Sequence, residues 1–253
     1  MHIHLLGYTG SIQHQEAGNV SLAVTDGNTS ILIDVSGAPV MALKQAGIDA
    51  RDLSLVMLTH SHIDHIYALP SLLHQLWLLG RTDALVIVGN GSTLSKAKEL
   101  CAVFALEHKS GMFPLVWEVL EEGPYLGPLG RLRLSVFPVP HGVPTLGVSV
   151  VTGDSKFVYL ADCTADFAYP ALAYDAALLI HEAGGTKEEE SVLTGKGHSS
   201  ARQAAMDART LRSGRLVLCH LPPDPSLYQK MLDEAKSVFE RTELPVLHET
   251  YEV

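Results

Sequence analysis

The sequence predicts a mixed α+β fold in which strands recur along the whole chain and helices separate groups of them. Short apolar or alternating runs indicate strands, and longer segments between them carry apolar residues at helical spacing. The 253 residues are within reach of one large domain. The chain shows no repeated motif, low-complexity segment or linker, so we expect a single domain over residues 1–253.

The local patterns give the order of these elements. Strands are expected at residues 1–6, 20–25, 30–34, 53–58, 84–89, 116–120, 131–137, 145–152, 156–160, 176–183 and 215–220. Helices are expected at residues 39–46, 69–79, 93–108, 199–211 and 226–240. We expect the stretch 116–140 to form a meander of neighbouring strands and residues 247–253 to form a short tail.

Turn and helix-end residues justify several of these boundaries. Asp26-Gly27-Asn28 and Gly153-Asp154 each join two expected strands, as is typical of tight hairpins. Pro70 suits the first turn of its helix, where a missing N–H group costs no hydrogen bond, and Gly47 ends the helix before it. The stretch Leu-Pro-Pro-Asp-Pro, residues 221–225, is a rigid stop after the last long strand.

Composition and charge limit the classes of function. No apolar run approaches the ~20 residues that span a bilayer, so no membrane segment is expected. Residues 1–6 lack the basic start and long apolar stretch of a secretion signal, and three widely spaced cysteines do not indicate a disulfide framework. We therefore expect a cytoplasmic protein. A net charge of −10 disfavours an extended surface that binds polyanions.

Residues 59–65, Thr-His-Ser-His-Ile-Asp-His, form the densest group of metal-binding side chains and directly follow an apolar strand. Neutral imidazole and carboxylate are ligands that zinc and similar ions prefer. Residues two apart in an extended segment point the same way, so His60 and His62 can grip one ion. Asp64 and His65 would face a second position. The alternative is a plain polar loop, but the full pattern after a strand is far more specific than a lone His-x-His.

The stretch Leu-Thr-His-Ser-His-Ile-Asp-His-Ile-Tyr-Ala-Leu-Pro-Ser-Leu-Leu, residues 58–73, resembles the signature of the metallo-β-lactamase superfamily, and its continuation resembles the ribonuclease Z branch. The resemblance covers most of the chain, from the opening Leu-Gly-Tyr-Thr-Gly through the last histidine motif. It implies a four-layer αβ/βα sandwich and a metal-dependent hydrolase. It also implies further ligands at the ends of other strands.

Three more residues match the superfamily's ligand positions: His141 in Pro-His-Gly, Asp162 in Ala-Asp-Cys-Thr and His220 in Leu-Cys-His. By resemblance, Asp162 would bridge two metals, because a carboxylate has two oxygens and a negative charge. The remaining ligands would be His60, His62 and His141 for one metal, and Asp64, His65 and His220 for the other. Asp34 matches an aspartate that supports the histidine turn by hydrogen bonds without binding metal.

Two further motifs are similar to those of ribonuclease Z. His181-Glu-Ala-Gly184 resembles that family's His-Glu-Ala-Thr, with glycine in place of threonine, and Gly197-His-Ser-Ser200 resembles Gly-His-Ser-Thr. The resemblance implies that His198 donates a proton to the leaving group and that Glu182 orients His198. The expected catalytic residues are these two together with Asp64 of the histidine motif. The alternative from the residues alone is that His198 merely begins a helix capped by a serine.

Two divalent ions would complete this site, with zinc favoured and manganese or iron as alternatives. Zinc lowers the pKa of a bound water from 15.7 to about 7, so hydroxide is available at neutral pH. We expect a phosphodiesterase whose substrate is a small-molecule phosphodiester, a nucleotide phosphodiester or another exposed phosphodiester. Two ions can hold both non-bridging oxygens of such a group, and its alkoxide leaving group needs a proton.

Other functions are ranked below this one. A lactonase, thioesterase or β-lactamase would use the same metal clamp with less need of a proton donor. A ribonuclease Z-like RNA endonuclease is disfavoured, because only residues 142–161 lie where that family has its arm for transfer RNA. Together with the acidic charge, this argues against an extended nucleic acid as a partner. A non-enzymatic metal-binding module and a diiron redox role rank last, and the resemblance leaves a homodimer open.

Overall fold

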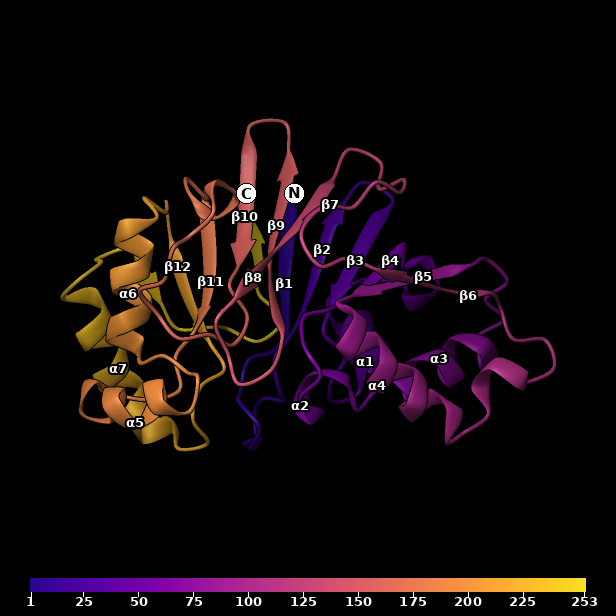
Figure 1. Ribbon diagram of the computed structural model, residues 1–253, viewed down its shortest axis with the longest axis horizontal. Coiled ribbons are helices and arrows are strands. Elements are labelled where there is room, and N and C mark those ends of the chain that lie inside the picture. Colours follow the sequence, from indigo (N-terminus) through magenta and orange to yellow (C-terminus); the bar gives the residue numbers. More distant parts are fainter.

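The computed structural model describes residues 1–253 and shows two seven-stranded sheets that pack face to face between two layers of helices. In Figure 1, helices α6 and α7 flank one sheet, and helices α1, α3 and α4 flank the other. This arrangement is a four-layer αβ/βα sandwich. The fold class predicted from the sequence is therefore confirmed.

The first sheet has the strand order β14-β1-β2-β3-β4-β5-β6. Its strands are β1 (His2–Gly7), β2 (Ser21–Asp26), β3 (Thr29–Ile33), β4 (Leu55–Leu58), β5 (Leu85–Gly89), β6 (Leu115–Val119) and β14 (Thr250–Glu252). Strands β1, β2 and β3 are antiparallel neighbours, whereas β3 to β6 run parallel. The carboxyl ends of the parallel strands therefore meet at one edge of the sheet.

The second sheet repeats this plan with the order β13-β12-β11-β10-β9-β8-β7. Its strands are β7 (Gly123–Pro124), β8 (Arg133–Val139), β9 (Thr145–Thr152), β10 (Ser155–Tyr159), β11 (Leu178–Glu182), β12 (Leu216–Cys219) and β13 (Thr242–Glu243). Strands β8, β9 and β10 alternate in direction, and β10 to β13 run parallel. Strands β8, β10, β11 and β12 therefore also end at a common edge.

The helices lie mainly on the two outer faces. They are α1 (Pro39–Gln45), α2 (Ile63–Ile66), α3 (Leu69–Leu78), α4 (Gly91–Ala102), α5 (Glu190–Gly195), α6 (Ala201–Thr210) and α7 (Tyr228–Lys236). Short 3₁₀ turns are η1 (Ala50–Asp52), η2 (Leu106–His108), η3 (Ala171–Ala173), η4 (Lys187–Glu189) and η5 (Pro225–Leu227). None of the helices combines the length and the apolar character that crossing a membrane requires.

Strand β4 illustrates why the central strands are apolar throughout. Side chains alternate across a strand, so Leu55 and Met57 pack between the two sheets, while Val56 and Leu58 pack beneath the helices. A strand that is covered on both faces gains from apolar residues at every position. The continuous apolar run before the histidine motif follows from this burial.

The expected meander at 116–140 is wrong. Strand β6 pairs in parallel with β5 in the first sheet, whereas β8 pairs with β9 in the second. The residues between them, including β7, cross from one sheet to the other. Alternating polarity identifies a strand, but it carries no information on which sheet the strand joins.

Several other boundaries differ from expectation, among them that of the helix expected at 226–240, which the structure shows as α7 at Tyr228–Lys236, and two of the differences have a clear physical reason. The helix expected at 93–108 ends at Ala102, and Ala105 adopts a left-handed backbone with φ of 48° before the turn η2. Val103 and Phe104 are exposed, so no packing holds a longer helix together. The expected tail contains strand β14, in which buried Tyr251 pairs with Ile3 of β1.

Candidate metal centre

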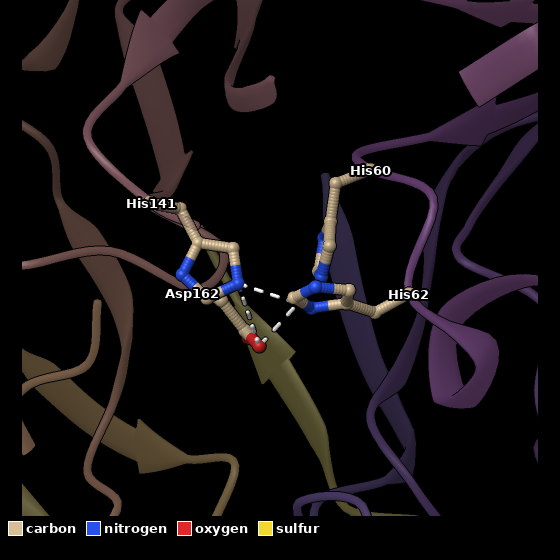
Figure 2. A group of neighbouring side chains, drawn as sticks. All are labelled: His60, His62, His141 and Asp162. Carbon is tan, nitrogen blue, oxygen red and sulfur yellow. Dashed lines mark hydrogen bonds and ion pairs between the residues drawn. The ribbon is translucent and has the colours of Figure 1, made fainter. Parts of the chain in front are cut away.

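The candidate site lies at the edge where the carboxyl ends of the parallel strands of both sheets meet. His60 follows strand β4 of the first sheet, and the motif continues into helix α2. His141, Asp162 and His220 follow β8, β10 and β12 of the second sheet. In Figure 2, His60 and His62 approach from one side and His141 from the other. The fold therefore brings residues from distant parts of the sequence to one place.

The first group consists of His60, His62, His141 and Asp162, whose candidate ligand atoms all lie within 4.8 Å of one another. Nε2 of His141 is 3.1 Å from Nδ1 of His62, and Oδ2 of Asp162 is 3.7 Å from Nε2 of His60. Three imidazoles and one carboxylate are a donor set that suits a tetrahedral zinc-like ion.

The second group consists of Asp64, His65 and His220, which meet the same 4.8 Å criterion. Oδ2 of Asp162 lies 3.5 Å from Nε2 of His65 and 3.2 Å from Nε2 of His220. Asp162 therefore adjoins both groups. The structure brings together all seven residues that the sequence analysis selected as metal ligands.

Several of these ligand atoms are buried without any hydrogen-bond partner. They are Nε2 of His60, Nε2 of His65, Nε2 of His220 and Oδ1 of Asp162. A buried polar atom left unpaired costs about 1–3 kcal/mol, so such a cluster needs a compensating partner. A divalent cation supplies that partner for imidazole nitrogens and carboxylate oxygens alike. The residues therefore fit a divalent metal.

Hydrogen bonds to Nδ1, on the side of the ring away from the site, fix the orientation of His65 and His141. Asp34 accepts from Nδ1 of His65 at 2.8 Å and from the backbone N–H of Thr59, also at 2.8 Å. Nδ1 of His141 donates to the carbonyl of Gly197 at 2.7 Å. With Nδ1 engaged, Nε2 of each ring carries the free lone pair and faces the site.

The backbone around the site adopts conformations that non-glycine residues rarely use. Asp34, Ala161 and His220 all have left-handed values of φ, at 57°, 56° and 50°. Such conformations are unfavourable for residues with a Cβ and persist where the surroundings enforce them. Each one lies at a strand end and turns the chain sharply at the site.

Electrostatics favour the ligand forms of His60, His62 and Asp162. Burial lowers the pKa of His60 and of His62, which keeps both imidazoles neutral. Burial opposes ionisation of Asp162, but His220 and His65 outweigh it and hold the pKa of Asp162 below its usual value. Neutral imidazole and ionised carboxylate are the forms that bind metal. For His65 and His220, burial lowers the pKa but the charge of Asp162 outweighs it and raises the pKa of both rings, so metal binding there would displace a proton.

Glu182 and His198 form a pair beside these groups. Nδ1 of His198 lies 3.1 and 3.0 Å from the two carboxylate oxygens of Glu182, which is fully buried. Burial lowers the pKa of His198, but the hydrogen bond to Glu182 and its charge prevail and raise the pKa to about 9. Because a carboxylate only accepts, Nδ1 donates to Glu182 and Nε2 is left for another partner.

The structure shows which residue caps the helix after His198. Oγ of Ser200 accepts from the backbone N–H of Gln203, so Ser200 is the N-cap of α6. His198 lies two residues earlier, where it makes no capping bond of its own. A structural role in capping therefore belongs to Ser200.

Sequence reasoning missed the contribution of the opening loop. Oγ of Ser11 donates to Oδ2 of Asp64 at 2.9 Å. A Cβ at neighbouring Gly10 would lie 3.0 Å from Cε1 of His220, so this glycine allows the loop to approach the ring closely. The only signal in the sequence is the weak Gly-x-x-Gly pattern of residues 7–10, which is typical of ordinary turns.

Comparison with known proteins gives consistent matches. The model of the β-lactamase superfamily domain matches residues 29–221. Ribonuclease Z of Ignicoccus hospitalis is 27% identical, over 83% of this chain and 84% of that protein. The metallo-β-lactamase fold protein YhfI from Bacillus subtilis has a TM-score of 0.85 at 21% identity, covering 99% of this chain and 98% of that one.

Human tRNase Z, short form, has a TM-score of 0.81 at 22% identity and covers 100% of this chain and 99% of that one. These matches overturn one expectation from the sequence, namely that an extended nucleic acid is not a partner of this protein. Relatives named ribonuclease Z and tRNase Z act on RNA. Net charge is a property of the whole chain and the interval 142–161 is one segment, so neither reports on the surface around the site.

Proposed function

We propose that this chain cleaves phosphodiesters. It belongs to the β-lactamase superfamily and is a metal-dependent hydrolase of its ribonuclease Z-like branch. The observation that carries the proposal is the pair Glu182–His198 beside the two ligand groups. An alkoxide leaving group of a phosphodiester needs a proton, whereas thiolates and phenolates leave readily without one. A dedicated proton donor therefore favours a phosphodiester over a thioester.

The donor set supports two divalent ions, for which we propose zinc. One would be held by His60, His62 and His141, the other by Asp64, His65 and His220, with Asp162 between them. When bound, such ions polarise the phosphoryl oxygens and lower the pKa of a water that attacks phosphorus. Because ligands come from both sheets, we propose that residues 1–253 act as one domain.

The exposure of the side chains indicates where a substrate approaches. The side chain of His198 is 22% exposed, whereas those of His141, Asp162 and His220 are exposed by 0%, 2% and 9%. A phosphodiester that approaches the ligand groups from solvent would therefore meet the exposed ring of His198 beside them, with its leaving oxygen on that side.

His198 is proposed to donate a proton from Nε2 to the departing oxygen. Glu182 holds the opposite nitrogen and stabilises the imidazolium before transfer. Proton transfer of this kind contributes about 10²–10⁴-fold to a rate. The substrate class includes small nucleotide diesters as well as a phosphodiester within an RNA chain, the latter in view of the ribonuclease relatives.

The test compares two diesters that differ in leaving group. Metal-analysed protein is assayed on bis(p-nitrophenyl) phosphate and on a dinucleotide with an alkoxide leaving group, beside its His198→Ala variant. His108→Ala serves as the matched control, because His108 is exposed and lies outside the site. A precursor transfer RNA, assayed in parallel, shows whether RNA is accepted.

We expect about two metals per chain and turnover of both diesters. His198→Ala should lower the rate of hydrolysis of the dinucleotide by about 10²–10⁴-fold and that of the activated ester much less. Metal-loaded protein that leaves every diester untouched but hydrolyses a lactone or thioester would overturn the proposal.

A further inference from the structure

A buried histidine and aspartate lie behind the Glu182–His198 pair and outside the ligand groups. Within β11, Leu178 and Ile180 face the core between the sheets, whereas Leu179 packs on the other side beneath helix α6. By the same alternation His181 faces α6, where it meets Asp207. Both side chains are almost completely inaccessible, at 0% and 2%.

Both ring nitrogens of His181 are committed. Nε2 lies 3.1 Å from Oδ2 of Asp207, and Nδ1 lies 2.9 Å from the backbone carbonyl of Glu182. A carbonyl only accepts, so Nδ1 carries a hydrogen and donates it to Glu182. The ring therefore ties the backbone at Glu182 to helix α6.

The second carboxylate oxygen of Asp207 reaches the loop that follows Asp162. The backbone N–H of Asp166 donates to Oδ1 of Asp207 at 3.3 Å and to the hydroxyl of Tyr169 at 3.1 Å. The same loop begins with Cys163, whose backbone N–H donates to Oε1 of Glu182. The carboxylate of Asp207 thus supports Glu182 in two ways. One runs through His181 in strand β11, and the other through the loop that contains Cys163 and Asp166.

The packing around this pair brings α6 close to the sheet. The residues of α6 that face β11 include Ala204, Ala205 and Ala208, which are fully buried and short. A helix that packs through alanines needs no buried charge to adhere to a sheet. A buried ion pair contributes little net stability compared with apolar residues of similar volume, but it fixes geometry through its hydrogen bonds.

We propose that His181 and Asp207 are positioning residues that hold the Glu182 carboxylate against Nδ1 of His198, so that the proton donor stays aligned with the ligand groups. The proposal rests on the proposed function of His198. Catalytic groups must be held within about 0.5 Å of their productive geometry, and a 1 Å displacement can cost about 10²-fold in rate. A purely structural role would weaken folding but affect all substrates alike.

The test uses Asp207→Asn, which keeps the shape of the side chain and removes its charge. The matched control is Asp175→Asn, because Asp175 pairs with Arg212 at the surface with no connection to Glu182. Each metal-loaded variant is assayed on bis(p-nitrophenyl) phosphate and on a dinucleotide, alone and combined with His198→Ala. Metal content is measured in parallel.

We expect Asp207→Asn to lower kcat on the dinucleotide by about 10–100-fold, with a much smaller loss on the activated ester and unchanged metal content. In the His198→Ala background the loss should vanish, because the group being positioned is gone. Equal losses on both substrates, or full additivity with His198→Ala, would overturn the proposal. Tyr169→Phe, which removes the hydroxyl that contacts the backbone N–H of Asp166 and the side chain of Asp207, should show the same pattern more weakly if Asp207→Asn does not fold.

A second measurement does not depend on activity. The proton on Nδ1 of His198 should give a downfield nuclear magnetic resonance signal that is preserved in Asp175→Asn and shifted or lost in Asp207→Asn. If the wild type cleaves no diester but this signal changes, the proposed function fails while the positioning role stands. If the signal is unchanged, the positioning role is wrong.

Discussion

The carboxylate of Asp34 accepts a 2.8 Å hydrogen bond from Nδ1 of His65, although 31 positions separate the two residues. Asp34 follows β3, and His65 belongs to helix α2 after the neighbouring strand β4. The same carboxylate accepts from the backbone N–H and the hydroxyl of Thr59. One buried side chain thus sets both the start of the histidine motif and the orientation of one of its rings.

Asp34→Ala should therefore impair metal binding without removing a ligand. Loss of such a supporting hydrogen bond typically lowers metal affinity or activity by about 10–100-fold. The unpaired N–H of buried Thr59 should also cost about 1–3 kcal/mol in the free energy of unfolding. Metal titration and urea unfolding measure the two effects. Asp34→Asn retains an acceptor and should be milder, so equal behaviour of both variants would contradict this account.

Gly10→Ala should displace the ring of His220. The added Cβ would lie 3.0 Å from Cε1 and 3.2 Å from Nδ1 of that ring, which is closer than ordinary contact. Gly18→Ala is the matched control, because nothing lies within 4 Å of its Cβ position. We expect weaker metal binding for Gly10→Ala alone, measured by competition with a chelator. Unchanged affinity would show that the loop yields instead of the ring.

Asp162→Asn should reduce the metal content below that of the wild type. An amide has one oxygen and no charge, so it neither bridges two cations nor offsets their repulsion. Activity should fall by more than about 10²-fold. Asp154→Asn, in the exposed turn between β9 and β10, should leave both quantities unchanged. Elemental analysis of the purified variants provides the measurement, and full occupancy in Asp162→Asn would exclude the bridging role.

Stability should depend on pH through the His181–Asp207 pair. Burial lowers the pKa of His181, but Asp207 and Glu182 outweigh burial and raise it above 6.5. A raised pKa in the folded state means that the pair stabilises the protein fully below pH ~6.5 and loses this contribution as pH rises through the folded value. In urea unfolding, the free energy of unfolding of the wild type should therefore exceed that of Asp207→Asn most at about pH 6 and less at about pH 9. A difference that is constant with pH would contradict it.

The local part of the site could be predicted from the sequence, and the non-local part could not. His60, His62, Asp64 and His65 stand together in one motif, so their chemistry is visible without a fold. Asp207 stands alone on a helix with other charged residues, and nothing in its surroundings in the sequence connects it with His181. The contact exists only because α6 packs across β11.

The fold was predictable to a similar extent. Turn residues such as Gly27 and Gly153 located the hairpins, because local backbone geometry determines them. The sheet to which β6 belongs depends on pairing across the chain, which alternating polarity does not encode. RNA was wrongly disfavoured as a partner for a related reason, since neither net charge nor the length of the interval 142–161 describes the surface around the site.

The division of the ligand groups between the two sheets has a mechanical consequence. His60, His62, Asp64 and His65 come from the first sheet, and His141, Asp162 and His220 come from the second. Neither sheet alone offers a complete group, so an ion at this edge would act as a tether between the halves of the sandwich. Ligands that bind only the native state stabilise it by mass action. Metal occupancy would thus report on whether the two halves of the chain are docked, and any variant that loosens the interface far from the edge should release metal before it unfolds.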